Sequence, residues 1–160
     1  MTTTTAYAIE EWLAGSRNNP SEPLNDWTQR SYTVLPMGVR FDAVRIPSDL
    51  VHAAVDTADD GVDHTVVADA LRLAVAGPVL ADHTRWYYAL VPPQSTDKWP
   101  CGLARCLGRG AWIVTPRATI TDHIGVHWCV PMDHPGALCD PARVVALIER
   151  GRDRLNDARR

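Results

Sequence analysis

Short runs rich in β-branched and aromatic residues, each ended by a proline, a glycine or polar turn residues, are the feature that most constrains the fold of this chain. Runs of this kind are typical of strands in a sheet. Several of these runs follow one another after only short turns, whereas parallel strands need long connections. They therefore predict a mixed or antiparallel sheet rather than a parallel one. The predicted strands are 32–35, 40–46, 79–81, 86–91, 112–115 and 127–130.

Three other stretches repeat apolar residues at steps of three and four, as the buried face of a helix does. They are 48–56, 63–76 and the stretch that begins at Pro141. Asp59-Asp60-Gly61 predicts a turn between the first two. We therefore predict an α+β fold with a single mixed or antiparallel sheet packed against two to three helices.

The two ends of the chain predict separate, less compact segments. Apolar residues recur at helical spacing from Thr5 to Leu13, which predicts a peripheral N-terminal helix. Residues 16–25 lack periodicity and are rich in Ser, Asn, Pro and Glu, so we interpret 1–25 as a helix and a linker. The compact domain then covers 26–150, and a basic C-terminal tail covers 151–160.

Composition places this chain among ordinary globular domains: it has 160 residues, 46% of them hydrophobic and 22% charged. A formal net charge of -3 excludes a global basic field, so any contact with nucleic acid has to be local. No apolar run approaches the ~20 residues that span a bilayer, and the N-terminus lacks a signal peptide. We expect a cytoplasmic protein that does not bind membranes. In that compartment, Cys101, Cys106, Cys129 and Cys139 are expected to be thiols.

Three residues near the last predicted strand are candidate metal ligands. His123, His127 and Cys129 are close in sequence, and zinc accepts imidazole and thiolate. His127 and Cys129 would share one face of a strand. Because no second well-spaced pair of ligands accompanies them, we favour a structural role, with Cys129 as a small core residue and the histidines at a strand edge.

The segment Arg85–Val91 combines an arginine with three aromatic residues on one predicted strand. Arg85 and Tyr87 would lie on one face, and Trp86 and Tyr88 on the other. One such face could stack the bases of a nucleic acid. Aromatic residues in strands more often fill a core, so we favour a role in packing for this segment.

Asp42 lies in the middle of a predicted strand and is the candidate catalytic residue. Two-metal phosphoryl transfer needs at least two carboxylates, commonly at alternate positions of one strand, and position 44 is a valine. The chain has neither a Gly-x-Ser-x-Gly elbow nor a Walker-type phosphate loop, which argues against acyl transfer and nucleoside triphosphate hydrolysis.

Several short apolar signatures together resemble a known family. They are Arg40–Pro47, Gly77–Val79, Tyr87–Val91, Ile113–Pro116 and Trp128–Pro131. Over about 31–131 the chain resembles the bifunctional DNA primase/polymerase N-terminal (prim-pol) domains of GC-rich bacteria. Active members of that family use paired acidic residues on one strand, a histidine on a following strand and divalent metal to join nucleotides.

This chain matches that pattern in part. Asp42 stands at one acidic position and Val44 at the other, while the strand 85–91 has no histidine and His83 only precedes it. The resemblance therefore implies a degenerate, non-catalytic member that has kept the fold.

Three functions follow as hypotheses. The leading one is a non-catalytic prim-pol-like accessory or regulatory module that binds single-stranded nucleic acid or a nucleotide, with Asp42, Arg40, Arg45, Arg85 and Tyr87 as candidate contacts. The first alternative is a protein-interaction module without a nucleotide site, in which Trp12 and the N-terminal helix dock on a partner. The second is a metal-dependent nucleotidyltransferase, a primase or polymerase, that uses Asp42 with Mg²⁺ or Mn²⁺.

Overall fold

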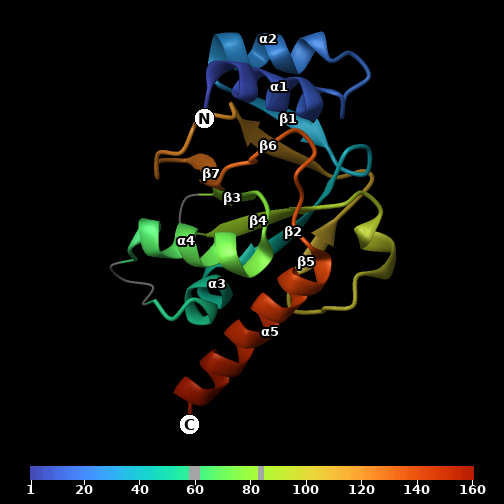
Figure 1. Cartoon of the computed structure of the whole chain (residues 1–160). Helices are drawn as coiled ribbons and strands as arrows, with labels where there is room; N and C mark the ends of the chain where they lie inside the picture. Colours follow the sequence, from blue (N-terminus) through green and yellow to red (C-terminus); the bar gives the residue numbers. More distant parts are fainter. Residues whose placement is uncertain (58–61, 83–84) are drawn as a thin grey trace.

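A five-stranded antiparallel sheet lies at the centre of the computed structural model, which describes residues 1–57, 62–82 and 85–160 (Figure 1). The strand order across the sheet is β5-β2-β4-β3-β7. These strands are β2 (Asp42–Pro47), β3 (Val79–Asp82), β4 (Trp86–Val91), β5 (Arg105–Leu107) and β7 (Val126–Val130). The predicted turn at Asp59-Asp60-Gly61 and the residue His83 lie outside the described residues.

A second, two-stranded sheet lies on one side of the central one. It consists of β1 (Tyr32–Pro36) and β6 (Trp112–Pro116), which pair antiparallel with Val34 opposite Val114. The α+β class and the antiparallel pairing are thus confirmed, but the single sheet that we predicted is wrong. A two-stranded ribbon is stable here because Leu35 and Ile113 on its inner face join a core with the central sheet.

Three helices cover the other face of the central sheet, at the bottom of Figure 1. They are α3 (Ser48–Ala54), α4 (His64–Val75) and α5 (Pro141–Ala158), and each begins close to its predicted start. Asp63 and Asp140 cap α4 and α5 by accepting hydrogen bonds from backbone N–H groups of the first turn. The core under these helices contains Val44 and Ile46 from β2 and Val67 and Leu71 from α4.

The C-terminal segment continues the last helix instead of forming a tail. We expected a basic tail over 151–160, yet α5 runs on to Ala158. Gly151 is buried, and a Cβ atom added there would collide with the carbonyl oxygen of Leu50 in α3. This glycine is therefore required for the close approach of α3 and α5, and the basic residues after it lie on an extended helix.

The first 30 residues form two helices, and both pack into the core that the two-stranded sheet shares with the central sheet, which we call the second core. Helix α1 (Thr3–Ala14) buries Ile9 and Leu13 completely, so the N-terminal helix is not peripheral. The predicted linker is wrong where helix α2 (Ser21–Arg30) begins. Trp27 of α2 is 1% exposed and donates a hydrogen bond from its indole N–H to the Thr115 carbonyl, 2.9 Å away. This bond joins α2 to β6.

None of the helices in the described ranges has the length and the apolar character needed to cross a lipid bilayer.

Candidate functional site

A large surface hollow lies at the β5 edge of the central sheet and extends to the start of β6. Its volume is about 1030 Å³. Side chains from β2, β5, the β5–β6 turn and the short 3-10 helix η1 (Ser95–Lys98) surround it. The charged residues among them are Asp42, Arg45, Asp97, Arg105 and Arg109.

Asp42 lies on the inner wall of this hollow, with 1% of its surface exposed. Its Oδ2 atom accepts two hydrogen bonds from Thr96, one from the backbone N–H at 3.1 Å and one from Oγ1 at 2.8 Å. Its Oδ1 atom is buried and accepts no hydrogen bond among the described residues. Because a buried carboxylate oxygen is costly without a partner, Asp42 is a candidate contact for a hydrogen-bond donor or a cation.

Two arginines face each other across the β2–β5 pair. Arg45 and Arg105 are directly opposite residues in the register of these strands, and both line the hollow. Like charges placed opposite each other on neighbouring strands destabilise a sheet. None of the ion pairs among the described residues involves Arg45 or Arg105.

Arg45 is also held in place by an aromatic contact. Its guanidinium lies 4.4 Å from the centroid of the Trp86 ring, while its Nε atom is buried without a hydrogen-bond partner in the described structure. Trp86 and Tyr88 thus belong to the face of β4 that carries Arg45. Burial and the charge of Asp82 raise the pKa of Tyr88, and Arg45 opposes this rise.

A glycine-rich turn closes the hollow between β5 and β6. Gly108, Arg109 and Gly110 form it, and Gly110 has a φ of +96°, which favours glycine. A Cβ atom on Gly108 would collide with the side chain of Thr96, so glycine is needed for the turn to approach η1. Glycine turns that leave the backbone accessible are common where protein binds phosphate.

The predicted ligand residues do not all meet at this hollow. Asp42 and Arg45 line it, but Arg40, Arg85 and Tyr87 do not. The Arg40 guanidinium lies over Trp12, 5.8 Å from the ring centroid, and packs against Gly15. The exposed Arg85 belongs to the turn before β4, where its carbonyl accepts a hydrogen bond from the Ser48 N–H.

Tyr87 was predicted to contact a ligand together with Arg85, and the register explains why it does not line the hollow. Residues 87, 89 and 91 of β4 point under the helices, so Tyr87 is 5% exposed. Its hydroxyl lies 2.9 Å from Nε2 of His52 in α3. Trp86 and Tyr88 lie half-buried on the opposite face of β4, where Tyr88 packs against the core shared with the two-stranded sheet.

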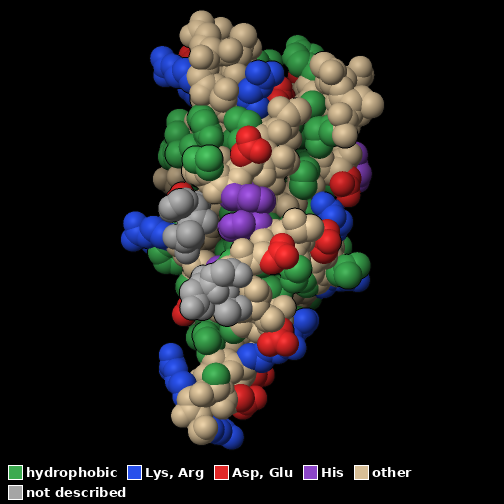
Figure 2. Space-filling model, turned by 90° about the vertical axis from the view of Figure 1, so that its left-hand side faces the viewer, with side chains coloured by type: hydrophobic (Ala, Val, Ile, Leu, Met, Phe, Trp, Pro, Cys, Tyr) green, Lys and Arg blue, Asp and Glu red, His purple; other side chains and the backbone are tan. Residues whose placement is uncertain are grey.

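The candidate metal ligands line a second, smaller cavity of about 280 Å³ between α4 and β7. His123, His127 and Cys129 meet there with His64, which the sequence did not suggest. The rings of His64 and His123 stack at 4.1 Å, and Figure 2 shows histidine side chains gathered on this face of the molecule. Within the described ranges, no group of three His, Cys, Asp or Glu residues is arranged to hold a metal ion.

Burial sets the chemistry of this second cavity. It raises the pKa of the Cys129 thiol to about 12, so Cys129 is protonated and a poor metal ligand. Burial lowers the pKa of His64, and the nearby His123, His127 and His52 lower it further, against the opposing effect of Asp63. All four cysteines of the chain are free thiols.

The surface of α1 around Trp12, which we predicted to dock on a protein partner, packs in part against the rest of this chain. Trp12 stacks on Phe41 with ring centroids 6.4 Å apart, and Glu10 of the same helix accepts a hydrogen bond from the Ala118 N–H at 2.9 Å. The apolar side of α1 therefore contacts the body of this protein.

Comparison of this chain with protein-family models, with curated proteins and with solved structures found no match.

Sequence reasoning missed most of the hollow. Arg105, Arg109 and Thr96 come from β5, a turn and η1, none of which was predicted. The Gly-Arg-Gly motif at 108–110 could have indicated this part of the hollow, because it predicts a turn that carries a positive side chain.

Proposed function

We propose that this protein binds a nucleotide or single-stranded nucleic acid through its phosphate groups, in the hollow between β2, β5 and the Gly108–Gly110 turn. The observation that carries this function is the convergence of three arginines without ion-pair partners in the described structure, Arg45, Arg105 and Arg109, on one concave surface. Guanidinium groups and glycine-turn amides are the groups with which proteins bind phosphate. The prim-pol-like signatures of the sequence agree with a ligand of this class.

The electrostatics favour a local anion site rather than general attraction. The whole chain carries a formal charge of -3, so a polyanion can be attracted only by a local cluster of positive side chains. The opposed pair Arg45 and Arg105 costs stability in the free protein, and a bound phosphate between them relieves that repulsion. Binding is therefore coupled to a higher stability of the sheet edge.

Titration of the purified protein with labelled dTTP, single-stranded DNA and single-stranded RNA at two salt concentrations tests this function. We expect binding that weakens as salt rises. The double variant R105Q/R109Q should lose at least about tenfold in affinity. For a single strand, the slope of log affinity against log salt concentration should become shallower by about 1.4, because each of two lost phosphate contacts contributes about 0.7.

The matched control removes two exposed arginines from α5, as R143Q/R150Q. This variant has the same net charge as R105Q/R109Q. Comparing the two therefore distinguishes phosphate contacts in the hollow from attraction by the net charge of the protein. Equal losses in the two variants, or no binding by the wild-type protein, would show that the hollow is not a phosphate site.

A second candidate function is metal-dependent nucleotidyl transfer, favoured by one observation. Asp97 lines the hollow together with Asp42, whose Oδ1 has no partner among the described residues. Mg²⁺ is commonly held by one or two carboxylates together with substrate phosphates. Extension of a labelled primer in Mg²⁺ or Mn²⁺ that is lost in D42A would support it, and absence of extension by the wild-type protein would leave the binding function alone.

A further inference from the structure

Trp112 is a large aromatic residue on the surface, at the border of the hollow. Its side chain is 55% exposed, and it is one of the residues that line the hollow beside Arg109 and Gly110. Aromatic residues of this size usually bury most of their surface, so an exposed one next to a cationic site is a candidate contact for a ligand.

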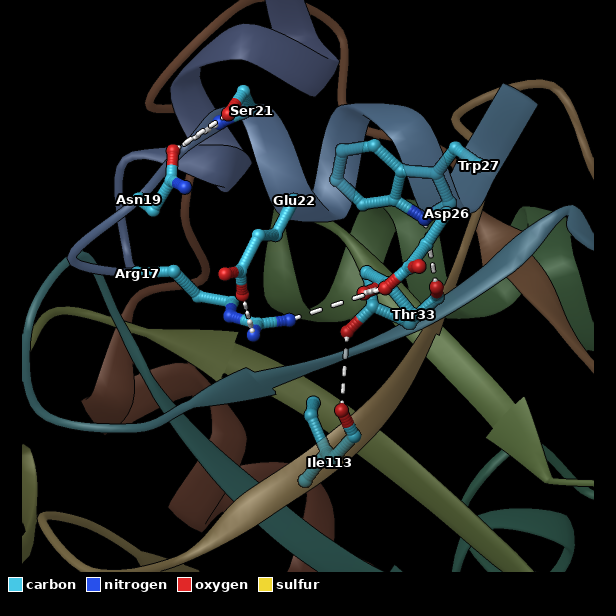
Figure 3. A network of polar contacts seen from close by, with 9 residues as sticks. Arg17, Asn19, Ser21, Glu22, Asp26, Trp27, Thr33 and Ile113 are labelled. Carbon is cyan, nitrogen blue, oxygen red and sulfur yellow. Dashed lines mark hydrogen bonds and ion pairs between the residues drawn. The ribbon is translucent and has the colours of Figure 1, made fainter. Parts of the chain in front are cut away.

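Arg17 holds one side of this tryptophan. Its guanidinium lies 5.9 Å from the centroid of the Trp112 ring. Figure 3 shows Arg17 between Glu22 and Asp26. The Arg17 Nη2 atom lies 2.5 Å from Glu22 Oε2, and Nη1 lies 3.9 Å from Asp26 Oδ2. Because two carboxylates already neutralise its charge, Arg17 positions Trp112 and does not bind phosphate itself.

This network is anchored to the two-stranded sheet. Asp26 accepts a hydrogen bond from Oγ1 of Thr33 in β1 at 2.8 Å. Arg17 is thereby tied to α2 and β1, and its side chain is 20% exposed. A ring supported in this way keeps its orientation before a ligand arrives, which lowers the entropic cost of stacking.

An apolar strip continues from Trp112 along the outer face of the β1–β6 sheet. Val114 lies two residues farther along β6 on the same face, and Val34 is directly opposite it on β1. Val114 is 46% exposed and Val34 is 44% exposed. We call Trp112, Val114 and Val34 the outer strip. It begins at the arginine-lined hollow and leads away from it.

We propose that the ligand is a single strand of nucleic acid several nucleotides long, with a phosphate in the hollow and the base of a neighbouring nucleotide stacked on Trp112. This inference rests on the proposed function, since the hollow supplies the phosphate contacts. A free nucleotide fills the hollow alone, whereas a strand also reaches the outer strip. Stacking on an exposed aromatic ring accepts any base, so the strand is bound without strong sequence preference.

Fluorescence anisotropy with the full-length protein tests this inference. We would measure the affinities of dTTP and of labelled dT4, dT8 and dT16 for the wild type, W112A and W112F. The control is Y7A, because Tyr7 on α1 is also 55% exposed and does not line the hollow. Circular dichroism and thermal unfolding verify that each variant is folded.

The wild-type affinity should rise from dTTP to dT8. W112A should bind dT8 about 5- to 150-fold more weakly, which corresponds to the loss of one stacked base, and its loss of affinity for dTTP should be smaller than its loss for dT8. W112F should keep most of the affinity for dT8, and Y7A should keep all of it.

Three outcomes overturn the inference. If W112A binds dT8 as tightly as the wild type, or loses as much affinity for dTTP as for dT8, the strand does not stack on Trp112. If the wild type is a dimer that W112A makes monomeric, with no change in dT8 affinity, the outer strip belongs to a second copy of the chain. If neither dTTP nor dT8 binds to the wild type, the proposed function itself fails.

Discussion

Thr96 donates both its backbone N–H and its hydroxyl to the same oxygen of Asp42, and the other oxygen of that carboxylate is buried without a partner in the described structure. The two residues are 54 positions apart in the chain, so this contact fixes η1 against β2. It also fixes the direction in which the free oxygen points, because both bonds fall on Oδ2. Asp42 is thus held rigidly at the wall of the hollow.

Replacing Thr96 with valine should destabilise the free protein. T96V keeps the backbone bond and removes the hydroxyl bond to a carboxylate, which should lower the free energy of unfolding by about 1–2 kcal/mol. Urea unfolding followed by circular dichroism measures this. The control T119V changes an exposed threonine and should stay within about 0.5 kcal/mol of the wild type. A T96V protein as stable as T119V would mean that the Asp42–Thr96 contact is weak.

Truncation of Leu13 tests whether α1 is part of the core. Leu13 is fully buried, so L13A should lower the free energy of unfolding by about 2–5 kcal/mol. L73A makes the same change at a leucine that is 81% exposed and should have an effect within about 0.5 kcal/mol. If the two variants are equally stable in urea, α1 does not pack as described.

Gly151→Ala tests the contact between α3 and α5. Replacing glycine with alanine inside an exposed helix normally stabilises it by about 1 kcal/mol. Here the added Cβ would meet the Leu50 carbonyl, so we expect a loss of about 1–3 kcal/mol instead. Gly102→Ala is the control, because nothing lies within 4 Å of a Cβ added there. A gain in thermal stability for G151A would disprove the close approach.

The histidine cavity should make stability depend on pH. The folded state lowers the pKa of His64 below its usual 6.5, mainly through burial and then through His123, so the unfolded chain binds its proton more readily. The contribution of neutral His64 is therefore present above about pH 6.5 and is lost as the pH falls below that value.

Urea unfolding at pH 7.5 and pH 5.5 measures this dependence. The wild type should lose more stability over this interval than H64Q does, whereas H134Q, which changes an exposed histidine of a loop, should follow the wild type. An H64Q protein with the same pH dependence as the wild type would exclude His64 as its source.

The sequence predicted most elements because their periodicity was strong. The stripe of Val67, Leu71 and Val75 located α4 to within a residue at each end, and the strand 86–91 was predicted with its observed bounds. Helix α2 was missed because Pro20 and Pro23 resemble linker residues, although proline is tolerated in the first turn of a helix. β5 was missed because three residues carry no periodicity.

The candidate site was harder to predict than the fold. Asp42 and Arg45 were found because they interrupt an apolar strand. Tyr87 was assigned to a ligand face because β4 is apolar on both sides, and no alternation shows which side the helices cover. Arg105 becomes informative only through its register with Arg45, and register across distant strands is not visible in a single sequence.

The second core can form only after most of the chain has been synthesised. Glu10 meets Ala118 and Trp27 meets Thr115, which are separated by 108 and 88 positions. During synthesis at about 5–20 residues per second, α1 and α2 therefore wait roughly 5–20 s for the strand that covers them. Throughout that interval Ile9, Leu13 and Trp27 have no partner surface from β6. Helices α1 and α2 therefore expose apolar side chains during this interval, although these side chains are among the most deeply buried ones of the finished fold.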